Sequence, residues 1–63
     1  MNAVAPEEDL RDRIVRTALA LFQDKGYRAT SLGDIIAAAN CSTGGFYHHF
    51  SSKDDLLFVI HDV

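Results

Sequence analysis

The sequence has little of what catalysis, secretion or membrane insertion requires. It contains one cysteine, one proline and no tryptophan in 63 residues, so an internal disulfide is excluded. No apolar run approaches the roughly 20 residues that span a membrane. The first nine residues, MNAVAPEED, lack the basic start and apolar centre of a secretion signal. We therefore expect a cytoplasmic protein that does not associate with a membrane.

Residues suited to metal binding or catalysis are also few and poorly placed. His48 and His49 are adjacent, and neighbouring residues of a helix point about 100° apart, so the pair cannot easily share one metal ion. Cys41 is better interpreted as a small apolar residue at a turn than as a nucleophile. No glycine-rich phosphate loop follows a strand. These observations predict no enzyme activity, no metal and no cofactor.

The stretch 31–50 predicts two short helices joined by a tight turn. Ser31 and Asp34 have the spacing of a capping box at the start of the first helix. Asn40 suits the left-handed turn that ends it, and Ser42 suits the N-cap of the second helix. One face of the first helix is apolar, through Leu32, Ile35, Ile36 and Ala39. This arrangement is typical of the helix-turn-helix that contacts DNA.

The second helix of this stretch has one apolar side and one polar side. Phe46 and Phe50 are four residues apart and are expected to anchor the helix on the core. At about 100° per residue, the outer surface consists of Thr43, Gly44, Tyr47 and His48. We predict that Thr43 and His48 contact base edges and that Tyr47 contacts phosphate.

Two adjacent glycines leave the first turn of this helix bare. Each glycine costs about 1 kcal/mol of helix stability relative to alanine. Without side chains, Gly44 and Gly45 let the backbone approach a phosphate or a base edge closely. The alternative is that one of them only lets the helix pack close to its neighbour. Both are predicted DNA-contacting residues.

Further phosphate contacts are predicted on either side of the helix-turn-helix. Thr30 and Ser31 place two hydroxyls at the start of a helix, where a phosphate can be held; the alternative is capping alone. Ser52 and Asp55 form a second predicted capping box, which makes Lys53 the first residue of a fourth helix. Because lysine at a helix start opposes the helix dipole, phosphate contact is the role that fits Lys53.

The remaining residues predict a long first helix and a partly covered fourth helix. The first helix is expected from about Asp9 or Leu10 to Lys25, with Asp9 as its N-cap, and residues 1–8 are expected to form a mobile tail. In the fourth helix, Leu56, Leu57 and Ile60 are expected on the core side, with Phe58, Val59 and Val63 left partly bare. The net charge is −3, but acids cluster near both ends, so a modest positive patch is expected between them. The alternative, which the charges taken alone favour, is that their distribution has no functional meaning.

The run from Ile14 to Leu57 resembles the N-terminal DNA-binding domain of TetR-family transcriptional regulators. The ordered set of pieces carries the resemblance: Ile14-Val15, Ala18, Leu21-Phe22, Lys25-Gly26-Tyr27, Thr30-Ser31-Leu32, Asp34-Ile35, Ala38-Ala39, Cys41-Ser42, Phe46-Tyr47, Phe50, Lys53 and Leu56-Leu57. We therefore expect an all-α, homeodomain-like three-helix bundle over residues 9–63, with the start of a fourth helix.

The resemblance also implies partners that these 63 residues do not contain. It implies a homodimer that binds a palindromic operator in double-stranded DNA, acts as a repressor and responds to a small-molecule effector. The effector and the dimer contacts belong to a C-terminal domain that is absent from this chain, so we expect a fragment of a longer regulator. The alternative is a small helical interaction module that docks on a protein through its fourth helix. The outer surface around Tyr47 and His48 favours DNA, because an interaction helix would present Leu, Met or Phe there.

Overall fold

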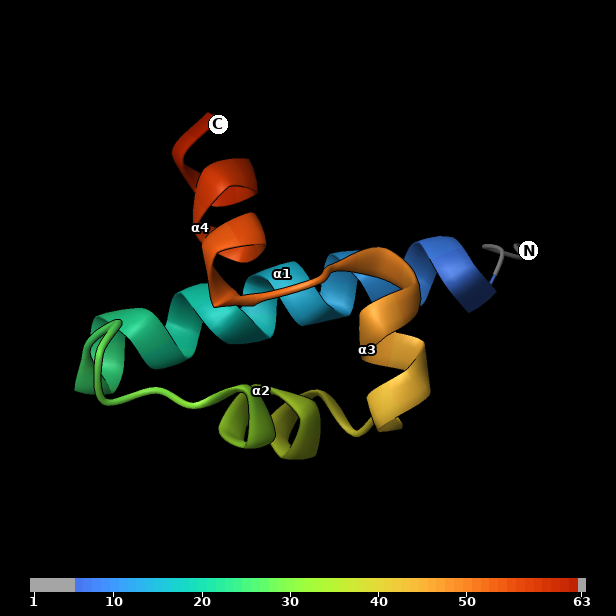
Figure 1. The fold of residues 1–63 in the computed structure, drawn as a ribbon, viewed down its shortest axis with the longest axis horizontal. Helices are drawn as coiled ribbons and strands as arrows, with labels where there is room; N and C mark the ends of the chain where they lie inside the picture. The colour runs from blue at the N-terminus through green and yellow to red at the C-terminus, as the bar shows by residue number, and fades with distance from the viewer. Residues whose placement is uncertain (1–5, 63) are drawn as a thin grey trace.

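Four helices make up the part of the chain that the structure describes. The computed structural model describes the backbone of residues 6–62 and the side chains of residues 10–60. The helices are α1 (Pro6–Lys25), α2 (Leu32–Ala39), α3 (Thr43–His49) and α4 (Lys53–Asp62). Figure 1 shows α1 along the long axis, with α2 below it, α3 near its N-terminal end and α4 rising from its middle. The all-α prediction is confirmed.

The start of α1 lies earlier in the chain than predicted. The helix begins at Pro6, so Asp9 lies inside it and is not the N-cap. Proline suits the first helical position because it has no N–H to leave unpaired and its φ is already helical. Residues 6–8 therefore belong to α1 and not to a tail, while residues 1–5 lie outside the described residues. The end of α1 is as predicted, with Gly26 at φ 94° and its N–H 2.9 Å from the Phe22 carbonyl oxygen.

The turn between α2 and α3 forms through the local signals in the sequence. The Ser31 hydroxyl accepts the Asp34 N–H at 3.0 Å and the Asp34 carboxylate accepts the Ser31 N–H at 3.1 Å, which completes the capping box. Asn40 adopts the left-handed conformation with φ 58° and ψ 49°. The Ser42 hydroxyl then accepts the Gly45 N–H at 2.9 Å. The predicted helix, turn and helix are confirmed.

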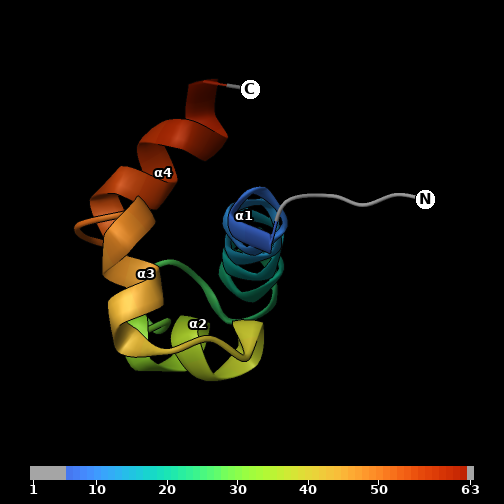
Figure 2. The same ribbon diagram turned by 90° about the vertical axis from the view of Figure 1, so that its right-hand side faces the viewer.

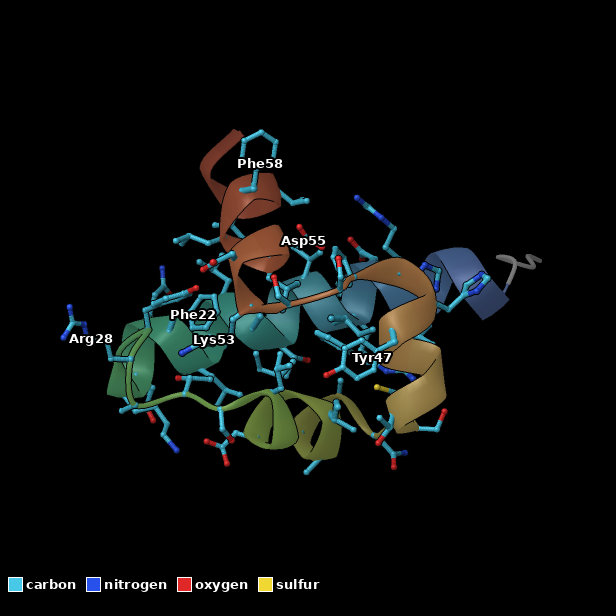
Figure 3. The ribbon with its side chains drawn as sticks, in the orientation of Figure 1. Phe22, Arg28, Tyr47, Lys53, Asp55 and Phe58 are labelled. Atoms are coloured by element: carbon cyan, nitrogen blue, oxygen red, sulfur yellow. The ribbon has the colours of Figure 1, made fainter. Side chains whose placement is uncertain are left out.

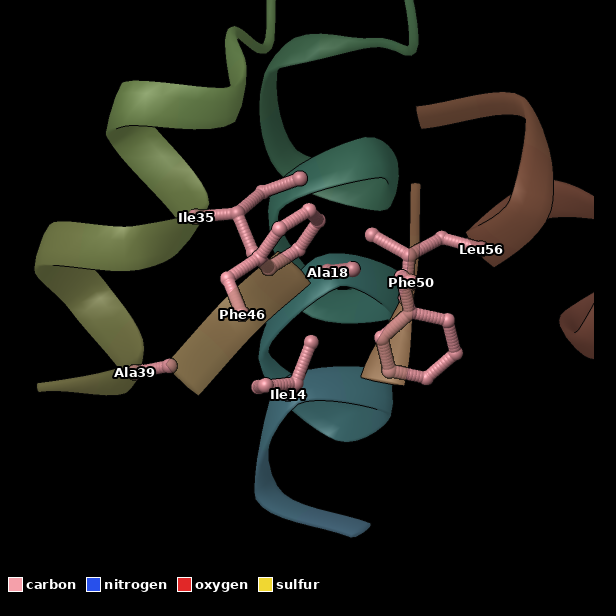
Figure 4. Packing of buried hydrophobic residues seen from close by; sticks show 7 residues of the cluster. All are labelled: Ile14, Ala18, Ile35, Ala39, Phe46, Phe50 and Leu56. Atoms are coloured by element: carbon pink, nitrogen blue, oxygen red, sulfur yellow. The ribbon is translucent and has the colours of Figure 1, made fainter. Parts of the chain in front are cut away.

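The core lies where the four helices meet. Phe46 is fully buried, Phe50 is 4% exposed, and their ring centroids are 5.9 Å apart. Figure 4 shows the seven buried apolar side chains gathered between the helices: Ile14, Ala18, Ile35, Ala39, Phe46, Phe50 and Leu56. Burial of the two phenylalanines, each worth about 1.5–3 kcal/mol, offsets the cost of the two glycines in α3.

α4 presents a different face to the core from the one predicted. Leu56 is buried, and Val59 and Ile60 pack against the core, which makes a stripe at i, i+3 and i+4. Leu57 lies about 100° away from that stripe and is 42% exposed. The prediction was therefore wrong for Leu57 and Val59, and correct for Phe58, which is 78% exposed. The predicted exposure of Val63 lies outside the described residues.

The capping at the start of α4 also differs by one residue from the prediction. The Ser52 hydroxyl accepts the Asp55 N–H at 3.3 Å, as a capping box requires. The Asp55 carboxylate, however, accepts the N–H of Ser51 at 2.8 Å and also the Ser51 hydroxyl hydrogen. These two bonds lower the pKa of Asp55. The start of α4 is thus tied to the segment that leaves α3.

Candidate nucleic-acid interface

The outer face of α3 is polar and carries no Asp, Glu, Lys or Arg side chain. Thr43, Gly44, Tyr47 and His48 are exposed, as the helical spacing predicts. Tyr47 is 50% exposed, and its ring meets the buried Phe46 edge-on at a centroid distance of 5.4 Å. In Figure 2, α3 and the first turn of α4 lie on the same side of the molecule, across from α1. The polar face of α3 therefore points outward, while the buried Phe46 anchors the opposite face in the core.

The two glycines of α3 stand in different surroundings. A Cβ added at Gly45 would lie 3.1 Å from the Ser42 hydroxyl oxygen and 3.4 Å from Leu10 Cδ2. The tight contact would be with the Ser42 cap, whereas the separation from Leu10 of α1 is that of an ordinary van der Waals contact. A Cβ added at Gly44 would meet no atom within 4 Å. The fold gives no packing reason for a glycine at position 44.

Two arginines of α1 support the ends of α2 and α3. Arg13 donates its Nε hydrogen to the carbonyl oxygen of Ala39 at 2.8 Å. Ala39 is the last residue of α2, where the helix dipole is negative and a cation is stabilising. The Arg11 guanidinium lies 5.4 Å from the centroid of the Phe50 ring, within the range of a cation–π contact. Sequence reasoning missed both residues, because Arg13 and Ala39 are 26 positions apart and no local spacing links them.

Thr30 and Ser31 have separate roles in the structure. Thr30 is fully buried, and its hydroxyl donates to the Gly26 carbonyl oxygen at 2.7 Å, because a buried hydroxyl and a helix-end carbonyl both need a partner. Its hydroxyl closes the α1–α2 loop. The prediction that this hydroxyl faces outward was therefore wrong. Ser31 is exposed, and its hydroxyl oxygen accepts the Asp34 N–H at the start of α2.

Lys25 and Asp34 join the end of α1 to the start of α2. Lys25 Nζ lies 3.1 Å from the Asp34 carboxylate. The Ser31 N–H and the Lys25 ammonium lower the pKa of Asp34. The carboxylate beside Ser31 is therefore paired with a cation, which reduces its repulsion of a nearby anion.

Lys53 is held against the α1–α2 loop. Its ammonium donates to the Tyr27 carbonyl oxygen at 2.7 Å and lies 4.2 Å from the centroid of the Tyr27 ring. The Tyr27 hydroxyl donates to the carboxylate of Asp54. This hydrogen bond raises the pKa of Tyr27, because only the neutral phenol can donate it. Figure 3 shows Lys53 reaching from the start of α4 toward the α1–α2 end of the molecule, where Arg28 extends outward. Sequence reasoning identified Lys53 but not its partner Tyr27.

The described residues were compared with two kinds of feature, a metal-ligand group and a membrane-spanning helix. Among residues 10–60, no group of three His, Cys, Asp or Glu side chains is arranged to hold a metal ion. No helix within residues 6–62 is long and apolar enough to cross a membrane.

Comparison with known proteins agrees with the geometry of α2 and α3. The family model described as bacterial regulatory proteins, tetR family, matches residues 14–60. The chain belongs to the TetR family. Its helix-turn-helix is therefore that of a DNA-binding domain in transcription regulation, and its relatives are regulators and not enzymes. No solved structure matched the chain.

Three similar TetR-family proteins illustrate the extent of the match. The chain is 43% identical over 47 residues to the uncharacterised regulator YerO of Bacillus subtilis, a match over 75% of this chain and 16% of YerO. It is 38% identical over 52 residues to the regulator QacR of Staphylococcus aureus, over 82% of this chain and 28% of QacR. It is 38% identical over 47 residues to the repressor KstR2 of Mycolicibacterium smegmatis, over 75% of this chain and 23% of KstR2. The chain thus spans less than a third of each of these relatives.

Proposed function

We propose that this chain is the DNA-binding part of a dimeric repressor and that α3 enters the major groove of double-stranded DNA. The observation that carries the proposal is the outer face of α3, where Thr43, Tyr47 and His48 are exposed and a side chain at Gly44 would meet no atom within 4 Å. Phe46 and the Ser42 cap hold that face in place. Membership of the TetR family supports the same docking.

Each side chain of this face suits a different part of the duplex. The Thr43 hydroxyl and the His48 imidazole can donate to or accept from base edges. The Tyr47 hydroxyl, the Ser31 hydroxyl and the Lys53 ammonium suit phosphate oxygens. The backbone at Gly44 suits close approach of the duplex. The Thr30 hydroxyl and Gly45 are left out of the proposed contacts, because both are committed inside the domain.

The whole regulator would act as a cytoplasmic homodimer on a palindromic operator. Helix-turn-helix dimers bind two half-sites about 34–36 Å apart, and KstR2, one of the similar proteins, is named a repressor. A small-molecule effector would bind in a C-terminal domain outside these 63 residues, since the matched relatives are longer than this chain. A protein-docking role for α4 is the rival, favoured by the exposure of Phe58.

The test is a selection of bound duplexes from a random pool, using two copies of the chain joined by a flexible linker. We expect a two-fold symmetric sequence to be enriched. His48→Ala should change the preferred base pair at one position of each half-site, at a cost of about 1–3 kcal/mol. The matched control is His49→Ala, because His49 is half-buried on the other flank of α3 and should leave the preference unchanged. No enrichment by the parent chain, or equal effects of the two variants, would contradict the proposal.

A further inference from the structure

The first turn of α4 brings one cation and two carboxylates together. A site that binds phosphate is weakened by nearby carboxylates, because like charges repel. Here both are held by donors of the protein itself: Asp55 by Ser51 and Asp54 by the Tyr27 hydroxyl. The cation, Lys53, is held by the same tyrosine.

Tyr27 fixes the Lys53 ammonium before any ligand arrives. The carbonyl oxygen takes one of the three N–H donors of the ammonium, and the aromatic ring lies beneath it. The remaining donors can still reach an anion. A lysine side chain loses much rotamer freedom when it is immobilised, and in this fold that cost is met on folding and not on binding.

Tyr27 also connects two of the predicted phosphate contacts, Ser31 and Lys53, through one loop. Its carbonyl oxygen accepts the Thr30 N–H at 3.3 Å, and Thr30 precedes Ser31 at the start of α2. Its ring packs edge-on against Phe22 of α1 at a centroid distance of 5.0 Å. Tyr27 therefore contacts both the residue that precedes Ser31 and the side chain of Lys53.

We propose that Tyr27 is a positioning residue for phosphate binding, which holds the Lys53 ammonium with its carbonyl and ring and holds the Asp54 carboxylate with its hydroxyl. The inference rests on the proposed function, because Lys53 stands beside a phosphate only if α3 binds DNA. Tyr27 itself need not touch the duplex.

The test compares Tyr27→Leu with Phe22→Leu in titrations of a duplex at several salt concentrations. Both variants lose the contact between the rings of Phe22 and Tyr27, but only Tyr27→Leu removes the ring beneath Lys53. Tyr27→Leu should weaken binding to every duplex by about 2–5-fold, the range of an exposed cation–π contact. The slope of log affinity against log salt concentration should be about 0.9 smaller in size for Lys53→Met than for the parent. The slope of Tyr27→Leu should change in the same direction. Phe22→Leu should keep the parent slope, and circular dichroism checks that each variant is folded.

A double-mutant cycle separates positioning from a merely structural role. In a Lys53→Met background, Tyr27→Leu should cause a smaller loss of DNA affinity than in the parent, because only the release of Asp54 remains. The same loss in both backgrounds would overturn the inference while leaving the proposed function intact. A parent chain that binds no duplex at low salt would overturn the proposed function and this inference with it.

A second pair of variants keeps the fold closer to the parent. Tyr27→Phe retains the ring and the carbonyl but releases Asp54, so DNA affinity should fall. Asp54→Asn should then raise affinity more in the Tyr27→Phe background than in the parent, because only there is the carboxylate free to repel phosphate. Equal gains in both backgrounds would show that the Tyr27 hydroxyl does not restrain Asp54.

Discussion

At the scale of single residues, the two glycines of α3 predict opposite responses to alanine. Gly44→Ala should stabilise the chain by about 0.5–1 kcal/mol, because alanine favours a helix and its methyl group meets no atom. The same methyl group should weaken DNA binding by intruding on the proposed contact. Urea unfolding and duplex titration measure the two effects separately.

Gly45→Ala is the matched control for that prediction. Its methyl group would crowd the Ser42 hydroxyl that caps α3, so the gain in helix propensity should be lost and the chain should be no more stable than the parent. A Gly44→Ala variant that binds the duplex as tightly as the parent would contradict the close approach proposed at Gly44.

The sequence did not distinguish the roles of neighbouring residues that have similar side chains. Thr30 and Ser31 were predicted to share one role, because both hydroxyls precede a helix. In the structure Ser31 caps α2, while Thr30 is buried and closes the preceding loop. The difference depends on the path of the chain after Gly26, which no spacing of residue types encodes. Leu57 is a similar case, since its exposure depends on how α4 leans on α1.

At the scale of helices, the ends set by local chemistry were predictable. The bounds of α2 and the start of α3 follow from Ser31, Asn40 and Ser42, whose hydrogen bonds span only three or four residues. The supports from α1 and the contact between Tyr27 and Lys53 were not predictable, because they join residues at least 26 positions apart. The sequence thus identified the helix-turn-helix, while the structure was needed to show what holds it.

The capping box of α2 predicts a pH-dependent stability. Hydrogen bonds from Ser31 and the contact with Lys25 lower the pKa of Asp34. Such a carboxyl stabilises the fold above its unfolded-state pKa of about 3.9, and this contribution is lost as the pH falls through the lowered folded-state value. Asp34→Asn should therefore destabilise the chain at pH 7 and make unfolding depend less on pH below about 4.

A matched substitution on α1 controls for the loss of a charge. Asp12 pairs with Arg16 at 3.3 Å, and both side chains are largely exposed. Exposed pairs contribute little to stability, so Asp12→Asn should leave both the stability and its pH dependence nearly unchanged. Thermal unfolding at pH 7 and pH 3 compares the variants, and equal behaviour of the two would show that the capping box does not stabilise α2.

The anchoring of α3 predicts that binding and folding are lost together in one variant. Phe50 is 4% exposed, and removal of a buried phenylalanine costs about 3–5 kcal/mol. Small domains have about 0.05–0.15 kcal/mol of stability per residue, so Phe50→Ala should remove most helical circular dichroism. Phe58→Ala, at a residue 78% exposed, should leave it intact. A folded Phe50→Ala variant that only fails to bind DNA would show that Phe50 is not an anchor.

At the scale of the whole molecule, the charge distribution limits how tightly one copy can bind. The net charge is −3, and Arg16 and Lys25 lie in ion pairs with carboxylates. Because most of the DNA affinity of a protein comes from cations at phosphates, a single copy should bind weakly, near the non-specific range of about 10⁻⁴–10⁻⁶ M. The proposed dimer would supply the rest by bringing a second α3 to the next half-site.

The most direct test is to titrate single and tethered copies of the chain on a two-fold symmetric site and on one isolated half-site. Tethering should raise the affinity for the symmetric site by roughly 10²–10⁴-fold, through effective concentration alone, and should have little effect on the half-site. Nanomolar binding of one half-site by the single chain in physiological salt, or an equal gain from tethering on both targets, would contradict the account of this chain as half of a dimeric DNA-binding regulator.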